Sequence, residues 1–305
     1  MNKIPNGVYP VMITPFTAEN TIDWDGVDRI VEFYARMGCQ GIFAVCLTSE
    51  MFLLSEDERV ALAARVVKAS AGCMCVVASG HVSDALDDQI RELARISQTG
   101  VDAVVMIANR LAAEGEDDDV AIGNMRRILD ALPNVRFGMY ECPSPYRRPL
   151  TDRLLEALAE SGRFAFIKDT CCDAEKMAHR IRLLDGRVQL FNANAATALE
   201  SLRAGASGFS GIMANYHPDL YVWLIDQFKA QPEKAEKLSA ALSVLSAAEG
   251  YHHPVDTKYH MNRIGVPMNL RSRCCEESVF SRLDRHFIDD MLVLEDEIRA
   301  LLAEK

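Results

Sequence analysis

Short runs of apolar and β-branched residues recur along most of the chain. Runs of this kind predict β-strands. Because neighbouring positions within a run are nearly all apolar, both faces of each strand are expected to be covered, as in a parallel sheet. The runs are Gly7–Ile13, Gly41–Cys46, Met74–Ala78, Asp102–Ile107, Val135–Tyr140, Phe164–Lys168, Val188–Phe191 and Ser207–Ile212.

Amphipathic segments with a period near 3.6 residues separate the runs and predict α-helices. Polar residues mark several helix starts: Ser55 with Glu58 has capping-box spacing, and Ser83 and Thr151 are N-cap candidates. The acidic cluster 117–119 suits a helix N-terminus, whose dipole attracts negative charge, better than a metal site. The predicted helices are Asp25–Met37, Glu56–Ala69, Asp84–Thr99, Val120–Leu132 and Ala174–Leu184.

The alternation of these strands and helices predicts an α/β fold, a (β/α)8 TIM barrel, over residues 1–230. A doubly wound open sheet is the alternative, but no GxGxxG motif follows the first strand. After Gln231-Pro232 the pattern becomes mostly helical, so residues 231–305 are predicted to form a C-terminal helical extension, packed on the barrel or on a partner subunit. Its predicted helices are Glu233–Ala248, Val255–Ile264 and Val279–Leu302.

The composition narrows the classes of function. The 305 residues are 49% hydrophobic and 25% charged, as in ordinary soluble globular proteins. A net charge of −11 argues against nucleic acid as a partner, because such binding needs clustered Lys and Arg. No run is long enough to span a bilayer, and the N-terminus lacks the apolar core of a signal peptide. The nine cysteines are therefore expected as reduced thiols in a cytoplasmic protein, and without CxxC spacing they predict no metal site.

Two polar residues end successive strand-like runs: Tyr140 ends one and Lys168 ends the next. In a (β/α)8 barrel the C-terminal ends of the strands form the catalytic rim, where these two would be neighbours. A buried lysine can lose its proton by desolvation and attack a carbonyl, and a nearby tyrosine can carry the proton that imine chemistry moves. The pair predicts a Schiff-base enzyme. The alternative is a structural lysine, solvated at a strand end or paired with Asp169.

Longer motifs surround this pair. Residues 11–16 read VMITPF near the start of the chain, and residues 54–59 read LSEDER after the second strand. With the Tyr140 and Lys168 segments and the three-helix tail, they resemble the dihydrodipicolinate synthase and N-acetylneuraminate lyase family. This family comprises class I aldolase-type (β/α)8 enzymes acting on pyruvate and other 2-oxo acids. The resemblance implies that Lys168 forms the imine and that Tyr140 relays protons.

The loop after the second strand departs from the family pattern. The family has GTTGE or GSTGE there, and its amides and hydroxyls hold the substrate carboxylate. This chain has Cys46, Leu47, Thr48, Ser49 and Glu50 instead. Because glycine permits positive φ and close backbone approach, its loss at positions 46 and 49 is expected to bend the loop differently. The resemblance implies carboxylate binding by Thr48 and Ser49, and a capping or loop-stabilising role for Thr48 and Glu50 is the alternative.

Further departures concern the rest of the rim. The synthase branch has a second relay tyrosine after strand four, where this chain has Ala108. Its arginine for a dicarboxylate ligand falls near Pro145, with Arg147 and Arg148 close by. Both losses argue against the lysine-pathway reaction. Strand eight lines the site in the family, which makes the Ser210-Gly211 pair a candidate for substrate contact.

The resemblance implies a Schiff-base lyase acting on a 2-oxo acid without metal or organic cofactor. Pyruvate would be the keto half of an aldol reaction, or a 2-oxo-3-deoxy sugar acid would be dehydrated through the same imine at Lys168. Dihydrodipicolinate synthase activity and a non-catalytic paralogue that binds 2-oxo acids are the alternatives. The family usually forms homotetramers, so a homo-oligomer is expected.

Overall fold

Each of the predicted apolar runs contains a β-strand, and every strand pair is parallel. The structure is a computed structural model that describes residues 3–304. Residues 1 and 2 of the predicted barrel segment 1–230 and residue 305 of the predicted extension 231–305 lie outside the described residues. The strand order is β1-β8-β7-β6-β5-β4-β3-β2. The strands are β1 (Gly7–Val8), β2 (Gly41–Phe43), β3 (Cys75–Ala78), β4 (Ala103–Ile107), β5 (Phe137–Tyr140), β6 (Phe164–Asp169), β7 (Gln189–Asn192) and β8 (Gly208–Phe209).

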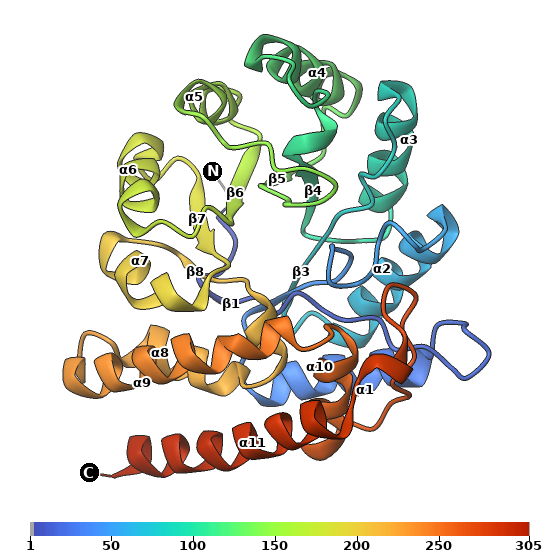
Figure 1. Cartoon of the computed structure of the whole chain (residues 1–305). Coiled ribbons are helices and arrows are strands. Elements are labelled where there is room, and N and C mark those ends of the chain that lie inside the picture. Colours follow the sequence, from blue (N-terminus) through green and yellow to red (C-terminus); the bar gives the residue numbers. More distant parts are fainter. Residues whose placement is uncertain (1–2, 305) are drawn as a thin grey trace.

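The sheet closes into a barrel where β1 approaches β2. An isolated bridge joins Val11 to Phe43, and the Met12 amide donates to the Phe43 carbonyl at 3.0 Å. A helix follows each strand and packs outside the barrel (Figure 1), which confirms the predicted (β/α)8 fold. These helices are α1 (Trp24–Arg36), α2 (Glu56–Ser70), α3 (Leu86–Ser97), α4 (Asp118–Ala131), α5 (Asp152–Glu160), α6 (Ala174–Leu184), α7 (Ala198–Ala204) and α8 (Pro218–Gln227).

Most of the predicted helix starts are confirmed. Ser55 and Glu58 form a capping box at α2, and Asp117 and Thr151 cap α4 and α5 with their side-chain oxygens. Ser83 is not an N-cap: the N-cap of α3 is Ala85, two residues later, and the Ser83 hydroxyl donates to Glu92 at 2.9 Å. The carboxylate is the stronger acceptor, and it draws Ser83 away from the helix start.

The barrel interior beneath the catalytic rim is filled by aromatic rings. Phe166 lies two residues before Lys168 and therefore on the same face of β6. Its ring occupies the space that a side chain at position 138 would take, because a Cβ on Gly138 would lie 2.3 Å from it. Phe191 packs edge-on against Phe166, with ring centroids 5.8 Å apart. A glycine in β5 thus makes room for the ring that supports the rim.

The C-terminal extension forms α9 (Pro232–Leu245), α10 (Val255–Arg263) and α11 (Arg282–Ala303), which confirms its predicted helical character. In Figure 1 these helices lie along one side of the barrel, beside α8 and α1. The Glu295 carboxylate of α11 accepts from His217 at 2.9 Å and from His260 at 3.0 Å, and all three side chains are buried. Short 3-10 turns complete the fold: η1 (Ala108–Arg110), η2 (Ala195–Thr197), η3 (Ile212–Asn215), η4 (Ser246–Gly250) and η5 (Glu277–Val279).

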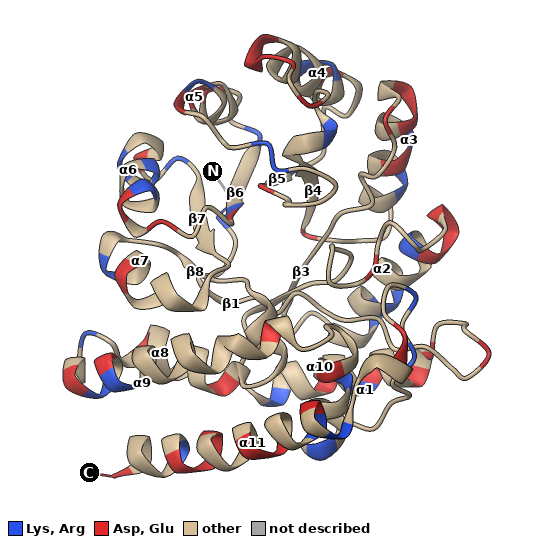
Figure 2. Ribbon diagram, in the orientation of Figure 1, with Lys and Arg blue, Asp and Glu red and all other residues tan. Residues whose placement is uncertain are grey.

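Charged side chains lie mainly on the outer helices and rim loops, whereas the strands are almost free of them (Figure 2). Among residues 3–304, none of the helices has the length and apolar content needed to cross a membrane.

Candidate active site

Lys168 and Tyr140 lie side by side at the C-terminal ends of β6 and β5. They are direct partners in the parallel ladder between the two strands. The Lys168 Nζ lies 4.2 Å from the centroid of the Tyr140 ring and 5.4 Å from that of Phe43. Both residues are buried, and Lys168 is only 4% exposed. The structure therefore brings the predicted pair together at the rim where barrel enzymes hold their chemistry.

Burial lowers the pKa of the Lys168 amine, because a charged ammonium loses its hydration in this setting. The thiols of Cys46 and Cys142 and the carboxylate of Glu249 oppose this change when they carry negative charge. The aromatic rings also favour the charged form through cation–π attraction. Desolvation is the largest of these effects, so a larger fraction of Lys168 is the neutral, nucleophilic amine than of an exposed lysine at the same pH.

The Tyr140 hydroxyl is held in its protonated form. Burial raises its pKa well above the ordinary value for tyrosine, and the neighbouring thiols of Cys142 and Cys46 raise it further. A protonated phenol can donate a proton, and here it lies beside an amine whose pKa is lowered. These are the two groups that imine formation needs, since the departing hydroxyl of the carbinolamine must receive a proton.

The side chains of Thr48 and Ser49, on the loop after β2, have different contacts. The Ser49 hydroxyl is fully buried, 2.7 Å from the Met12 carbonyl oxygen, and it accepts from the Cys46 amide at 3.1 Å. It is committed to holding the loop. Thr48 is also buried, and its hydroxyl makes no hydrogen bond to another residue in the part of the chain that the structure describes. Thr48 is the residue of the pair with a side chain available for a ligand.

One residue of this loop has a left-handed backbone conformation. Positive φ occurs at Glu50 (61°) and not at Cys46 or Ser49. The Glu50 carboxylate accepts from the backbone amides of Arg273 and Cys274, at 2.5 and 2.9 Å. Glu50 thus has a loop-stabilising contact, and its partner is the C-terminal extension.

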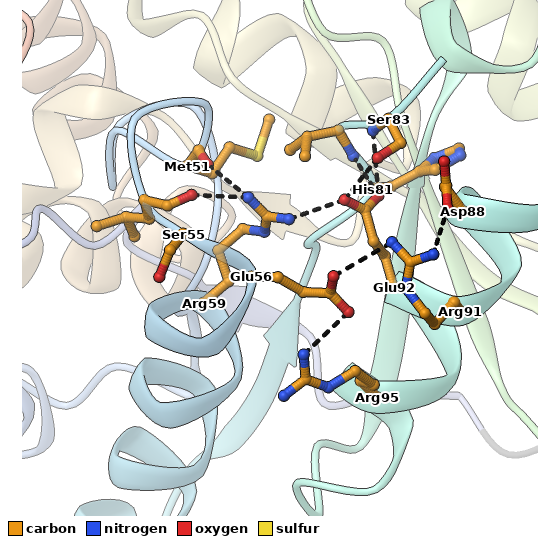
Figure 3. Close-up of polar contacts among 12 residues, drawn as sticks. Met51, Ser55, Glu56, Arg59, His81, Ser83, Asp88, Arg91, Glu92 and Arg95 are labelled. Carbon is orange, nitrogen blue, oxygen red and sulfur yellow. Dashed lines mark hydrogen bonds and ion pairs between the residues drawn. The ribbon is translucent and has the colours of Figure 1, made fainter. Parts of the chain in front are cut away.

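A buried ion pair fixes the next part of the same loop (Figure 3). Arg59 of α2 donates to Glu92 of α3 at 2.8 Å and to the Leu54 carbonyl at 2.7 Å. Glu92 also accepts from the amides of Val82 and Ser83. The pair therefore ties the loop after β2 to the loop after β3, and both loops belong to the catalytic rim.

His81, at the end of β3, has a structural role. Its Nδ1 accepts from the Ile107 amide at 2.9 Å, and its Nε2 lies 2.7 Å from the Gln89 side-chain oxygen. Burial lowers the pKa of the imidazole to about 4, so the ring is neutral near pH 7. With both nitrogens bonded, His81 connects β3 to β4.

Ser210 and Gly211 follow β8 at the same rim. The Ser210 amide donates to the Asn192 carbonyl at 2.7 Å, which continues the contact between β7 and β8. A Cβ on Gly211 would lie 2.4 Å from the Ala193 carbonyl oxygen, so glycine is required there by close backbone approach. Both residues are buried. Their contact with substrate stays a prediction.

Two of the three arginines near the rim form ion pairs, and the third does not within residues 3–304. Arg110 forms an ion pair with Asp84. Arg148, on the loop after β5, is buried and donates to Asp118 at the start of α4 at 3.1 Å. Arg147 is exposed, and it forms no ion pair within the described residues 3–304. Its positive charge opposes, in part, the rise that burial causes in the pKa of Tyr140. Arg147 is therefore the arginine available to an anionic or hydroxylated ligand.

Sequence reasoning missed Glu249, which lies in η4. Burial raises the pKa of its carboxyl to about 7, and the positive charge of Lys168 opposes the rise. η4 contacts η3, the turn that follows β8. No motif marks this residue, because its approach to Lys168 depends on how the C-terminal extension folds back over the rim.

The alternative role for Lys168, an ion pair with Asp169, does not match the contacts of Asp169. Its carboxylate binds Arg180 of α6 at 2.6 Å. This arrangement follows from strand geometry, because consecutive side chains on β6 point to opposite faces of the sheet.

The sequence profile of the dihydrodipicolinate synthetase family matches residues 4–275. The chain belongs to this family. The 4-hydroxy-tetrahydrodipicolinate synthase of Methanocaldococcus jannaschii is 26% identical over 279 residues, covering 89% of this chain and 93% of that protein. The enzyme of the same name from Marinobacter nauticus is 24% identical over 265 residues, covering 85% and 89%.

Solved structures share the fold over the same extent. Dihydrodipicolinate synthase from Bacillus anthracis matches with a TM-score of 0.87 and 19% identity, covering 96% of this chain and 99% of that one. A catalytic lysine mutant of Ruminococcus gnavus sialic acid aldolase also has a TM-score of 0.87, with 17% identity and 97% coverage of both chains. The predicted family and barrel are confirmed, and this member of the dihydrodipicolinate synthetase family is a lyase of the class I aldolase type.

Proposed function

We propose that the protein is a Schiff-base lyase acting on a 2-oxo acid, with Lys168 as nucleophile and Tyr140 as proton carrier. The observation that carries this proposal is the buried Lys168 amine of lowered pKa, 4.2 Å from the Tyr140 ring centroid. A neutral amine attacks a carbonyl, and a protonated phenol on the neighbouring strand can protonate the oxygen that leaves.

In the proposed cycle Lys168 attacks C2 of the 2-oxo acid, and Tyr140 donates a proton as the carbinolamine loses water. The protonated imine withdraws electrons from C3. Tyr140, now deprotonated, takes the proton of the C4 hydroxyl as the C3–C4 bond breaks, which leaves an enamine and releases an aldehyde. Protonation at C3 followed by hydrolysis frees pyruvate. Loss of a C3 proton and of a C4 hydroxyl from the same imine gives dehydration instead. Neither route requires a metal or an organic cofactor.

The substrate carboxylate is assigned to the loop after β2. The uncommitted Thr48 hydroxyl supports this assignment, and Ser49 contributes by holding the loop through its buried hydroxyl. Ser210 and Gly211 are assigned to the wall of the site near the imine. Arg147, exposed on the loop after β5, is assigned to the distal end of the substrate. A 2-oxo acid with an anionic or hydroxylated tail, such as a 2-oxo-3-deoxy sugar acid, suits this set.

Synthase activity of the kind named for the relatives is the second candidate, because two of them are 26% and 24% identical to this chain. Ala108 weighs against it, since a methyl group cannot relay a proton. The family is usually oligomeric, and we propose a homo-oligomer, with a homotetramer as the expected form.

Trapping with borohydride tests the proposal. Borohydride reduces the imine to a stable amine, so pyruvate or another 2-oxo acid is expected to add irreversibly to Lys168, as located by mass spectrometry of peptides. Lys168→Met is the control, because it removes the nucleophile and should abolish the adduct completely. Absence of an adduct with any 2-oxo acid would refute the proposal. An adduct without turnover of any aldol substrate would favour the non-catalytic, 2-oxo acid-binding alternative.

A further inference from the structure

A buried ion triad lies directly behind the Tyr140–Lys168 pair. Glu141 follows Tyr140 and Asp169 follows Lys168, so both carboxylates point out of the barrel toward the helices. Arg180 of α6 reaches both of them. Its Nη1 donates to Glu141 Oε2 at 2.7 Å and to Asp169 Oδ2 at 2.6 Å.

The triad is sealed from solvent and its contacts extend to the neighbouring backbone. Arg180 and Glu141 are 1% exposed, and Asp169 is fully buried. Arg180 Nη2 also donates to the Leu150 carbonyl at 2.9 Å, and Asp169 Oδ1 accepts from the Cys171 amide at 2.8 Å. Buried charges are stable only when their partners are in place, so this geometry tolerates little movement. The planar guanidinium adds directionality, because its donors are fixed in a fork.

Hydrogen bonds to the backbone also join the C-terminal ends of β5 and β6. The Glu141 amide donates to the Lys168 carbonyl at 3.1 Å, and the Thr170 hydroxyl donates to the Glu141 carbonyl at 2.5 Å. The ends of β5 and β6 are therefore connected by backbone bonds between them and by Arg180 behind them. Any shift of one strand end relative to the other would have to break these bonds.

We propose that Arg180 is a positioning residue that holds the Tyr140 hydroxyl and the Lys168 amine in the geometry for imine formation. The inference rests on the proposed function of these two residues. Arg180 does not touch the substrate in this scheme: it acts through Glu141 and Asp169, each adjacent in sequence to a reacting side chain. The alternative is a purely stabilising triad, which would contribute to folding without affecting the rate of the chemistry.

Arg180→Lys separates these two roles. A single ammonium retains the charge but cannot reach Glu141, Asp169 and the Leu150 carbonyl together. A displacement of about 1 Å at reacting groups can slow a reaction on the order of 100-fold. We therefore expect the maximal rate of borohydride-trapped imine formation with pyruvate to fall at least about tenfold. The half-saturating pyruvate concentration should change by less than about threefold, because the carboxylate loop follows a different strand.

Arg299→Lys is the matched control. Arg299 also bridges two carboxylates, Asp219 at 2.7 Å and Glu295 at 3.5 Å, but these partners lie on α8 and α11, and neither is adjacent in sequence to Tyr140 or Lys168. It should lower the midpoint of thermal unfolding while leaving the trapping rate unchanged. Glu141→Gln is a second test that retains the Arg180–Asp169 pair, and it should slow trapping less than Arg180→Lys does.

The outcomes are distinct. A lower maximal rate in folded Arg180→Lys, with unchanged half-saturation and normal trapping by Arg299→Lys, supports the positioning role. If Arg180→Lys does not fold, slower trapping by Glu141→Gln supports it instead. Unchanged maximal rates in the folded variants, or equal loss in both arginine variants, would overturn this inference alone. If the unaltered protein traps no 2-oxo acid, the proposed function fails and the positioning role fails with it.

Discussion

The charge state of Lys168 depends on one neighbouring carboxyl. Glu249 has a pKa raised to about 7, chiefly by burial, and its ionised form raises the pKa of Lys168 against the larger effect of desolvation. Glu249 is therefore mostly protonated at pH 6 and mostly ionised at pH 8. Its influence on the lysine should be present only at the higher pH.

Glu249→Gln tests this coupling through its pH dependence. At pH 8 the variant lacks the negative charge, so the pKa of Lys168 falls and the fraction of neutral amine rises. We expect trapping of pyruvate to be roughly two- to fivefold faster than in the unaltered protein at pH 8, because more of the amine is neutral in the variant. At pH 6 the two rates should agree within about 1.5-fold, because Glu249 is already neutral there. A ratio that is the same at both pH values would show that the carboxyl acts sterically.

At the scale of single elements, helix caps anchor the rim loops to the helices that follow them. The Ser55 hydroxyl accepts from the Glu58 amide at 3.1 Å, and the Glu58 carboxylate accepts from the Ser55 amide at 2.8 Å. Ser55→Ala should lower the free energy of unfolding by about 1 kcal/mol, the usual cost of losing an N-cap. Ser83→Ala is an informative comparison, because Ser83 is not a cap, although its hydroxyl does bind Glu92. Denaturant titration at constant pH would measure both, and an unchanged midpoint for Ser55→Ala would contradict the prediction.

The elements were largely predictable from sequence because each carries a local signal. Apolar runs located the strands, and α6 has the predicted bounds, Ala174–Leu184. The pairing of Tyr140 with Lys168 followed from counting strands in a parallel barrel. Contacts set by long-range packing left no such signal. The commitment of Ser49 to the Met12 carbonyl, for example, depends on how two distant loops meet.

The same reasoning explains why the partners of the rim residues were not predicted. Asp169 stood next to Lys168 in sequence, yet its ion pair is with Arg180, which projects from the following helix. Glu249 approaches the site only because η4 folds against η3. Periodicity predicts which face of an element is buried, but it does not predict which buried charges from separate elements will meet.

At the scale of the whole molecule, the C-terminal extension contacts the catalytic rim. The Lys258 amine of α10 lies 3.7 Å from the Glu50 carboxylate, and the Ser272 hydroxyl donates to the same carboxylate at 3.0 Å. Burial lowers the pKa of Lys258 to about 8, and the charge of Glu50 opposes this change. Because Glu50 ends the loop that carries Thr48, the position of the proposed carboxylate site depends on a segment more than two hundred residues away.

Arg273 offers a test of this dependence, because its side chain joins the extension to the barrel. It binds both oxygens of Glu58, at 2.6 and 2.9 Å, and its guanidinium lies 4.6 Å from the Phe16 ring centroid. Arg273→Ala should lower the free energy of unfolding by about 2 kcal/mol, since a mostly buried bidentate pair and a cation–π contact are lost. It should also raise the pyruvate concentration needed for half-maximal trapping, because the Glu50 contact with the backbone of residues 273 and 274 would loosen.

Arg285→Ala is the control, because Arg285 lies over the rings of Tyr259 and Phe280, inside the extension. It should destabilise the protein without changing half-saturation. Calorimetry should show one unfolding transition for the unaltered protein and for both variants, since buried contacts such as His217 with Glu295 couple the extension to the barrel. A separate early transition for the extension would contradict this coupling, as would equal half-saturation in the two variants. Together the two measurements decide whether residues 231–305 serve the site or only cover the barrel.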